Sequence, residues 1–378
     1  MKVYFDNAAS TKVRDEAVDA VVRAMREDFG NPSSTHYMGR QAAAIKEEAR
    51  KNIASALGAS PENIYFTSGG TEANNWAILG LANVQARKGK HIVTSATEHD
   101  AVFEAVKKLE SMGWEATYLM PDKAGRITTE TFSSALREDT AFASVMIVNN
   151  ETGAINPISE FAGEIKRRNL NTLLHTDAVQ GFCKLPISVK TLGADLVAVS
   201  AHKLHGPKGA GALYVKQGIT LPQALIGGSQ ESGRRPGTEA LPAIAGFGEA
   251  ARLGHLESNK TSAAVLELRN YTVSLLKNSL PEAVFIGGGD SPYLLSLSLP
   301  GHKSEVLMSF LEAEGICVSK SSACKKGARS RVLESMRLKN DVIDGALRVS
   351  FSKYNTKEEA EYFVQTLKLA SETLFKPL

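Results

Sequence analysis

The sequence predicts an α/β protein with a mostly parallel sheet that is covered by helices on both faces. Short apolar runs alternate with stretches in which apolar residues recur at helical spacing, the order typical of α/β folds. The chain has 378 residues, of which 43% are hydrophobic and 22% are charged, an ordinary globular composition. A chain of this length buries a substantial core without disulfides, and its composition excludes a disordered, collagen-like or coiled-coil protein.

Up to about residue 257 the alternation is regular. Apolar runs predict strands at residues 64–67, 91–95, 115–119, 143–148, 173–176, 196–199 and 212–215. Apolar residues at helical spacing follow the first strand, and further helices are predicted at 101–112 and at 157–168, which starts with a proline. Because helices separate these strands, we expect most of them to pair in parallel, buried on both faces.

After about residue 257 the pattern changes to fewer strands and more helices. Helices are predicted at 263–280, 304–314 and 356–374, and strands at 293–299 and 346–351. The strand 293–299 alternates Ser and Leu, which predicts a half-exposed strand. We therefore expect a large domain at 13–257 and a smaller α+β domain made of 1–12 and 258–378. The Gly-rich stretch 227–237 is expected to be a mobile or interface loop.

Charge and cysteine content narrow the class of protein. The 44 basic and 41 acidic residues are interspersed and give a net charge of +3, so neither nucleic acid nor membrane is an expected partner. Cys183, Cys317 and Cys324 form no CxxC pair, which argues against a disulfide framework and against a metal site. Cys317 lies in an apolar run and is expected to be a small core residue, and Cys183 is expected to be structural.

The first residues lack the apolar stretch of a signal peptide, and no run of about 18 apolar residues follows anywhere in the chain. We therefore expect a cytoplasmic enzyme.

A glycine turn between the strand 64–67 and the next helix is the first motif with chemical content. Residues 67–72 are Thr-Ser-Gly-Gly-Thr-Glu. Glycine lets the backbone approach a ligand closely, and a helix N-terminus offers free N–H groups and a positive dipole end to phosphate. The alternative is a plain turn in which Thr71 caps the helix.

Two lysines follow the predicted strand 196–199. They are Lys203 and Lys208, in Ser-Ala-His-Lys-Leu-His-Gly-Pro-Lys-Gly at residues 200–209. A lysine at the end of a core strand is a candidate for a desolvated, nucleophilic amine that forms a Schiff base. The alternative is a solvated lysine in a basic turn. Spacing favours Lys203, because it is nearer the strand.

Asp177 directly follows the predicted strand 173–176, at the sheet edge where open α/β folds bind ligands. A carboxylate there could pair with a pyridinium nitrogen and keep a cofactor ring electron-withdrawing, although an Asp that starts a turn is the alternative. A phosphate cradle, a lysine at a strand end and an acid 26 residues before it (203 minus 177) together suit pyridoxal 5′-phosphate.

The chain also resembles the cysteine desulfurases of the class V aminotransferase group, which have fold type I of the pyridoxal-phosphate enzymes. The resemblance is carried, in order, by TSGGTEANN, ATEHDAV, NNETG, HTDAVQ, SAHKLHGPKG, RRPGTE and SSAC. It runs from YFDNAAST near residue 4 to LRVSF near residue 351. It implies a large domain with a mostly parallel seven-stranded sheet, a smaller α+β domain and a homodimer in which the stretch 227–238 crosses between subunits.

The resemblance also implies roles for individual residues. Lys203 is similar to the lysine that binds the cofactor covalently, and Asp177 to the partner of the ring nitrogen. The other implied cofactor contacts are Gly70, Thr71, Ser200 and His202 at the phosphate, Thr238 at the phosphate of the neighbouring subunit, Asn150 and Gln180 at the ring hydroxyl, and His99 stacked on the ring. The resemblance also implies a catalytic role for His99, in proton transfer. Arg348 resembles the arginine that binds the substrate carboxylate. A helix-capping His99, a turn at Asn150 and a surface Arg348 are the alternatives.

Cys324 resembles the nucleophilic cysteine that accepts sulfur. Small residues precede it and four cations follow it within seven residues, and nearby positive charge favours the thiolate. An incidental thiol beside a basic loop is the alternative. The family commonly continues this cysteine with small polar residues and a longer loop, whereas here only seven residues separate Cys324 from Val332. The shorter stretch bears on how far Cys324 reaches and which acceptor it meets.

We therefore expect an enzyme that converts L-cysteine to L-alanine and passes the sulfur to Cys324 as a persulfide. An acceptor protein or small thiol would then take the sulfur, for iron–sulfur clusters or thio-cofactors. One alternative is a selenocysteine lyase or another class V aminotransferase-like enzyme, and another is a non-catalytic sulfur carrier or scaffold. The sequence does not indicate the acceptor, the pathway, or the preference between cysteine and selenocysteine.

Overall fold

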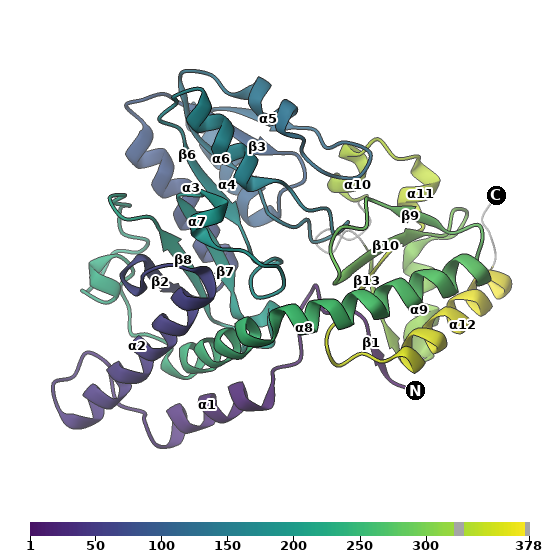
Figure 1. Cartoon of the computed structure of the whole chain (residues 1–378), viewed down its shortest axis with the longest axis horizontal. Coiled ribbons are helices and arrows are strands. Elements are labelled where there is room, and N and C mark those ends of the chain that lie inside the picture. Colours follow the sequence, from purple (N-terminus) through teal and green to yellow (C-terminus); the bar gives the residue numbers. More distant parts are fainter. Residues whose placement is uncertain (321–328, 375–378) are drawn as a thin grey trace.

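A seven-stranded sheet forms the centre of the larger part of the molecule (Figure 1). The computed structural model describes residues 1–320 and 329–374. In spatial order the strands are β2 (Ile64–Thr67), β8 (Gly211–Val215), β7 (Leu196–Ser200), β6 (Leu173–Asp177), β5 (Thr140–Ser144), β3 (His91–Ser95) and β4 (Glu115–Leu119). Strand β8 runs antiparallel to both of its neighbours, and all other neighbouring pairs are parallel. The predicted mostly parallel, seven-stranded sheet is confirmed.

Helices cover both faces of this sheet. Alternate residues of β7 point to opposite faces of the sheet. Leu196 and Ala198 pack against one set of helices, and Val197 and Val199 pack against the other. The first set is α3 (Gly70–Gln85) and α4 (Asp100–Glu110). The second set includes α2 (Tyr37–Leu57), α5 (Thr129–Ala135), α6 (Ile158–Arg167) and α7 (Val189–Leu192). The apolar runs of the strands arise from this two-sided burial.

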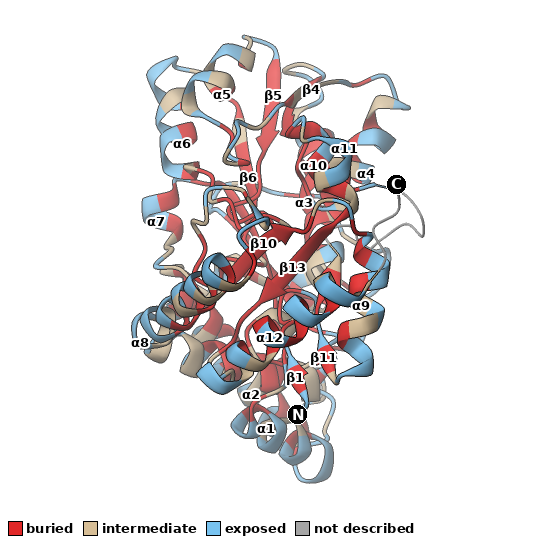
Figure 2. Cartoon of the chain, turned by 90° about the vertical axis from the view of Figure 1, so that its right-hand side faces the viewer, coloured by how far each residue is buried: buried red, intermediate tan, exposed pale blue. Residues whose placement is uncertain are grey.

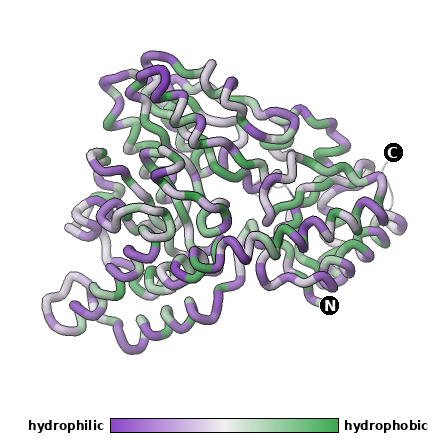
Figure 3. Tube along the Cα trace, viewed as in Figure 1, coloured by the Kyte–Doolittle hydropathy of each residue, from purple (hydrophilic) through white to green (hydrophobic). Residues whose placement is uncertain are grey.

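A single long helix, α8 (Leu241–Ser279), connects the two halves of the molecule (Figure 1). Its 39 residues correspond to about 58 Å at 1.5 Å per residue. Its first part packs against α1 (Asp15–Arg26) and α2, and it also contacts α12 (Lys357–Thr373) of the C-terminal part. Gly248 permits the close crossing with α2, because a Cβ there would lie 2.5 Å from Cα of Ala49. In Figure 3 the outer helix α1 is mostly hydrophilic, while the interior strands are hydrophobic.

The C-terminal part has its own sheet and core. Its antiparallel sheet has the order β12 (Ser319–Lys320), β13 (Ala346–Ser350), β10 (Leu294–Ser298) and β9 (Val284–Ile286). Beside it β1 (Val3–Tyr4) pairs in parallel with β11 (Ile316–Cys317), so the N-terminus belongs to this core and buries Phe5 in it. Helices α9 (Ser304–Ala313) and α12 cover one face, and α10 (Arg331–Ser335) and α11 (Asn340–Asp344) lie near the other.

Two expectations about this part are wrong. Strand β10 is buried on both faces (Figure 2), with Ser296 only 1% exposed, because α10 and α11 cover the serine face as well. The alternation of Ser and Leu in the sequence does not indicate that helices also cover the serine face. Cys317 is exposed rather than part of the core. Its neighbours Ile316 and Val318 point inward, and the period of two in an extended chain turns the residue between them outward.

The predicted division of the chain at residue 257 stays a prediction; that residue lies inside the continuous helix α8. Among the described residues, no helix combines the length and apolarity required to cross a bilayer. Within those same residues, no cluster of three or more His, Cys, Asp or Glu side chains could hold a metal ion.

Candidate active site

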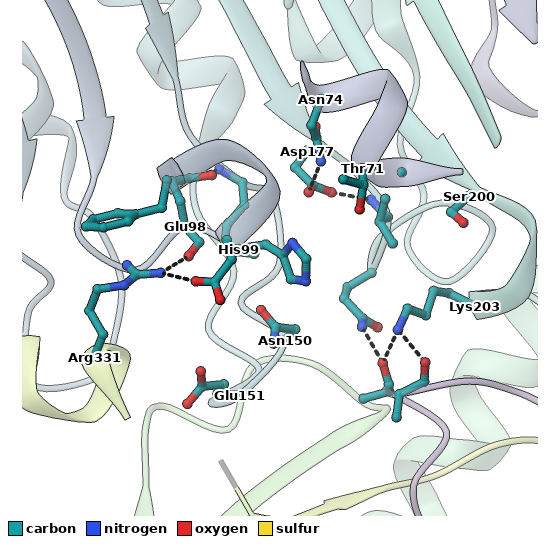
Figure 4. A pocket seen from close by; sticks show the side chains of 18 of the residues that line it. Thr71, Asn74, Glu98, His99, Asn150, Glu151, Asp177, Ser200, Lys203 and Arg331 are labelled. Atoms are coloured by element: carbon teal, nitrogen blue, oxygen red, sulfur yellow. Dashed lines mark hydrogen bonds and ion pairs between the residues drawn. The ribbon is translucent and has the colours of Figure 1, made fainter. Parts of the chain in front are cut away.

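A cavity of about 570 Å³ opens at the carboxyl ends of the central parallel strands, between the two halves of the molecule (Figure 4). Of the twelve site residues predicted from the sequence, the cavity lining brings together Gly70, Thr71, His99, Asn150, Asp177, Gln180, Ser200, His202, Lys203 and Arg348. Thr238 is exposed and does not line this cavity in the single chain. Cys324 lies outside the described residues.

Lys203 projects into the cavity from a single 3₁₀ turn, η2 (Ala201–Lys203), that follows β7. Its Nζ donates hydrogen bonds to the carbonyl oxygens of Ala8 and Ala9, each at 2.6 Å (Figure 4). Burial lowers the pKa of Lys203 to about 8, and the positive charge of Arg348 acts in the same direction. A neutral amine is therefore accessible near physiological pH, as a Schiff-base lysine requires. Lys208, the other candidate, does not line the cavity.

Asp177 sits at the end of β6 with both carboxylate oxygens engaged. Asn74 Nδ2 donates to Oδ2 at 2.6 Å, and the backbone N–H of Val179 donates to Oδ1 at 2.9 Å (Figure 4). Two donors on opposite oxygens fix the orientation of the carboxylate plane. The position at the end of β6 was predictable, whereas the role of Asn74 was not, because it lies on α3, 103 residues earlier in the chain.

The start of α3 forms the candidate phosphate cradle. A Cβ on Gly70 would lie 2.8 Å from Cγ2 of Val179. Any side chain at position 70 would therefore collide with Val179, and only glycine fits there. The hydroxyl of Ser200 is buried nearby and has no hydrogen-bond partner in the described part of the chain. No side chain caps the N-terminus of α3, so its free N–H groups and the Ser200 hydroxyl form a donor set suited to phosphate.

His202 faces the same cavity. Burial, together with the charges of neighbouring lysines, lowers its pKa to about 4. Its ring is therefore neutral at physiological pH, and it can donate one hydrogen bond without adding charge.

Gln180 is held in one orientation by a buried lysine that the sequence did not single out. Lys184 is 8% exposed, and its Nζ donates to Oε1 of Gln180 at 3.1 Å. Because Lys184 Nζ is a hydrogen-bond donor, the amide oxygen of Gln180 faces it and the amide nitrogen of Gln180 must face the other way. It donates to the carbonyl of Ala8 at 2.9 Å, the same oxygen that accepts from Lys203. Burial lowers the pKa of Lys184 to about 7, and the charges of Lys203 and Arg348 contribute.

Arg348 forms the opposite wall from β13 and is buried, not a surface residue. Its Nη1 donates to the carbonyl of Asn150 at 3.0 Å, and Nη2 donates to Oδ1 of Asp6 at 2.8 Å. Among the residues that the structure describes, Nε has no hydrogen-bond partner. The guanidinium thus presents an unsatisfied donor in the cavity region, which an incoming carboxylate could engage.

His99 caps α4, as one of the two interpretations expected, and it also lines the cavity; its stacking on a cofactor ring stays a prediction. Its Nδ1 accepts a hydrogen bond from the backbone N–H of Ala101 at 3.1 Å. A neutral ring therefore carries its proton on Nε2. This contact fixes the ring orientation above the cavity floor (Figure 4).

Glu98, next to His99, is a lining residue that sequence reasoning missed. It is 1% exposed, and one carboxyl oxygen accepts from the hydroxyl of Ser95 at 2.6 Å and from the N–H of Met146 at 2.9 Å. The other oxygen has no hydrogen-bond partner in residues 1–320 and 329–374. Burial raises the pKa of Glu98 to about 8, so the carboxyl is mostly protonated at neutral pH.

Glu151 and Arg331 occupy the rim of the cavity. Ser330 donates a hydrogen bond to Glu151, whose pKa burial raises to about 7. Arg331 binds the loop that carries His99. Neither was named as a site residue from the sequence, although Glu151 belongs to the motif NNETG and Arg331 is one of the four cations that follow Cys324.

The chain matches the family model described as aminotransferase class-V over residues 3–363. It belongs to this family. It is 40% identical over 378 residues to a cysteine desulfurase IscS from Dictyoglomus turgidum, covering 99% of this chain and 95% of that protein. It is 41% identical to a cysteine desulfurase IscS from Methanosarcina thermophila, covering 97% and 91% of the two chains. These matches place the chain among the cysteine desulfurases of the family, as the resemblance of the motifs implied.

Solved structures show the same fold. A NifS-like protein superposes with a TM-score of 0.94 at 36% identity, covering 99% of this chain and 100% of the other. A structure of SspA in complex with cysteine superposes with a TM-score of 0.83 at 31% identity, covering 94% of this chain and 100% of the other. The prediction of fold type I, with a large sheet domain and a smaller α+β part, is confirmed.

Proposed function

We propose that the protein is a pyridoxal-phosphate-dependent cysteine desulfurase that converts L-cysteine to L-alanine and holds the released sulfur on Cys324 as a persulfide. The observation that carries the proposal is the meeting, in one cavity, of an amine with a lowered pKa, Lys203, and a doubly hydrogen-bonded carboxylate, Asp177. A relative 40% identical over 99% of the chain is a cysteine desulfurase, and a structural neighbour binds cysteine.

The residues present fit pyridoxal phosphate. Gly70, Thr71, Ser200 and His202 would hold its phosphate, because this region combines a buried hydroxyl without a partner and an uncapped helix N-terminus. Asp177 would pair with the ring nitrogen, Gln180 and Asn150 would meet the ring hydroxyl, and His99 would stack on the ring. When bound, the cofactor supplies an electron-withdrawing ring that stabilises negative charge at the substrate Cα.

The chain's own residues supply proton transfer and orientation. Lys203 Nζ, with its pKa near 8, takes the proton from the substrate Cα at neutral pH. Nε2 of His99 carries a proton that it can donate beside the reacting atoms. Arg348 orients the substrate through its carboxylate, which places Cα toward Lys203.

Cys324 completes the reaction as the sulfur acceptor. Its thiolate attacks the substrate sulfur, so a sulfur–sulfur bond forms while the substrate bond between Cβ and sulfur breaks. The electron pair of the broken bond stays on Cβ, which takes up a proton, and alanine is released. An acceptor protein or small thiol then takes the sulfur by exchange. The relatives named IscS support delivery to iron–sulfur cluster assembly. We further propose that the enzyme works in the cytoplasm as a homodimer, with Thr238 completing the phosphate site of the neighbouring subunit.

The test is to incubate the cofactor-loaded enzyme with L-cysteine, quantify alanine, and locate added sulfur by mass spectrometry of peptides. The wild type should release alanine and gain one sulfur atom at Cys324. Cys324→Ala should lose both, whereas Cys317→Ala, which removes an exposed thiol elsewhere, should behave as the wild type. Equal alanine release by Cys324→Ala and the wild type would contradict the assignment of the nucleophile.

A second variant tests the cofactor site. Lys203→Ala should prevent covalent attachment of the cofactor. After borohydride reduction, denaturation and removal of small molecules, mass spectrometry should find the pyridoxyl group on Lys203 of the wild type and none on the variant. Retention of covalent cofactor by this variant would show that another lysine holds it. Comparing cysteine with selenocysteine as substrates separates the desulfurase from a selenocysteine lyase.

A further inference from the structure

An ion pair joins the first turn of α3, where the phosphate would bind, to the Gly-rich stretch 227–238. Nε of Arg235 donates to Oε1 of Glu72 at 2.8 Å, and Nη2 of Arg235 donates to Oε2 of Glu72 at 3.1 Å. Each of the two side chains is 19% exposed. Among the residues that the structure describes, Glu72 forms no other ion pair. The two-pronged contact therefore fixes the position of this carboxylate and balances its charge.

Glu72 also holds the backbone turn that leads into α3. Its Oε2 accepts a hydrogen bond from the N–H of Ser68 at 2.7 Å, and Ser68 directly precedes the N-cap residue Gly69. The hydroxyl of Thr67 donates to the carbonyl of Gly69 at 3.0 Å. These two contacts close the turn that brings Gly70 into the lining of the cavity. The position of the Glu72 carboxylate thus bears on the shape of the candidate phosphate cradle.

The charge of Glu72 opposes the binding of phosphate at the same helix end. The N-terminus of a helix attracts negative charge, and a phosphate monoester carries a charge of about −1.5 to −2 near pH 7. An unpaired carboxylate in the first turn would repel that group, and such repulsion stays significant at the effective dielectric constant of a partly buried site. The guanidinium of Arg235 cancels the charge of Glu72, which leaves the positive end of α3 to the phosphate.

Arg235 is not needed by the acids on either side of it in the chain. Glu231 pairs with Nη2 of Arg50 at 2.8 Å. Glu239 pairs with Nζ of Lys46 at 2.7 Å. Each of these buried carboxylates has a cation of its own, so the guanidinium of Arg235 serves Glu72.

The backbone that carries Arg235 is held close to the cradle by Glu231. A carboxylate oxygen of Glu231 accepts from the N–H of Phe66 in β2 at 2.9 Å. Glu231 and Ser232 have positive φ angles of 50° and 57°, a conformation that costs energy for residues other than glycine. The buried contacts of Glu231 maintain this conformation. The chain therefore reaches Arg235 from a fixed point beside the strand that precedes the cradle.

We propose that Arg235 is a positioning residue for the cofactor phosphate: it pairs with Glu72, so that the turn before α3 stays closed and the helix end receives the phosphate without an opposing charge. The proposal rests on the proposed function, in which this helix end holds the phosphate of pyridoxal phosphate. Neither Arg235 nor Glu72 lines the cavity, so Arg235 acts through Glu72 and not by contact with the phosphate.

The experiment measures the affinity of the full-length chain, freed of cofactor, for pyridoxal phosphate and for pyridoxal, which lacks the phosphate. Both ligands are titrated into the wild type, Arg235→Met and the double variant Arg235→Met/Glu72→Gln, and binding is followed by visible absorption. Arg252→Met is the matched control, because it breaks a two-pronged pair with Glu249 on α8, away from the cavity. Binding of pyridoxal also shows that each variant is folded.

For Arg235→Met we expect pyridoxal phosphate to bind about tenfold more weakly and pyridoxal to bind as in the wild type. The double variant should recover most of the affinity for pyridoxal phosphate, because the glutamine carries no charge and its amide oxygen can still accept from Ser68. Arg252→Met should match the wild type with both ligands.

Three results would overturn the proposal: equal weakening of both ligands in Arg235→Met, unchanged binding of pyridoxal phosphate in that variant, or no recovery in the double variant. The last result would mean that Arg235 does not act through Glu72. A wild type that binds pyridoxal phosphate no more tightly than pyridoxal would instead refute the phosphate cradle and the proposed function, since that result precedes any comparison of variants.

Discussion

The protonation of Glu98 leads to a quantitative prediction about stability and pH. This carboxyl is buried beside the cavity, with its pKa raised from 4.5 to about 8, chiefly by burial and also by the charge of Asp177. Folding at neutral pH therefore requires Glu98 to take up a proton. Because its pKa is higher in the folded than in the unfolded state, its ionisation costs stability progressively as the pH rises from 4.5 to about 8.

The magnitude follows from this difference. At about 1.36 kcal/mol per pKa unit, the cost reaches roughly 3 kcal/mol at pH 7 and at most about 5 kcal/mol above pH 8. Glu98→Gln keeps the shape and removes the ionisation, and its Oε1 can still accept from Ser95 and Met146. At about 2.1 cal/mol/K per residue, 3 kcal/mol corresponds to a rise of roughly 4 °C in Tm for a chain of this length.

The assay is thermal unfolding of the wild type and Glu98→Gln between pH 5 and pH 8.5, with saturating cofactor present at each pH. The two Tm values should nearly coincide at pH 5 and diverge as the pH rises, with the variant more stable. Glu130→Gln, at an exposed position of α5, serves as the control and should follow the wild type. A variant that is less stable by the same amount at every pH would refute the reasoning, since Glu98 would then be ionised in the folded protein.

Three further outcomes are expected. Lys184→Met should weaken cofactor retention in dialysis, because Gln180 loses the donor that fixes its amide; unchanged retention would show that the amide is held otherwise. Arg50→Met should lower stability by about 3 kcal/mol in denaturant unfolding, because buried Glu231 loses its guanidinium partner at 2.8 Å and keeps the backbone N–H of Phe66 at 2.9 Å and a lysine 3.8 Å away. Gly248→Ala should cost about 1–3 kcal/mol by forcing α2 and α8 apart, and a Tm equal to that of the wild type would contradict this close crossing.

Local pattern predicted the central strands where turns bound them on both sides. The bounds of β2, β3 and β4 agree with the predicted ranges 64–67, 91–95 and 115–119. Strand β5 ends four residues earlier than predicted, at Ser144, because the apolar run continues beyond the sheet as a buried segment. Apolar character alone does not distinguish a strand from a buried connection.

The first half of α8 was missed for a different reason. Gly246, Gly248 and Gly254 lower the intrinsic helix propensity of this stretch, yet they are the residues that let α8 approach its neighbours, as the short distances from a Cβ at Gly246 and Gly248 show. Tertiary packing thus outweighs propensity there. A prediction from the sequence sees only the local cost of the glycines.

In the candidate site, the residues carried by motifs were predicted, and those that support them were not. Asp177 and Lys203 follow apolar runs, which marks them in the sequence. Asn74 and Lys184 act through a carboxylate and an amide that only the fold brings near them. Arg331 depends on contacts with residues more than 230 positions away.

The uninterrupted course of α8 has a consequence for how the two halves of this molecule can move. The helix is about 58 Å long and has one end in each core. A change in the width of the cavity therefore requires α8 to bend. We expect the bending to concentrate around Gly254, because glycine has no side chain to stiffen the helix there. A Cβ at this position would lie only 3.1 Å from Cβ of Cys183. The rate of amide hydrogen exchange along α8 would therefore report how often the site opens.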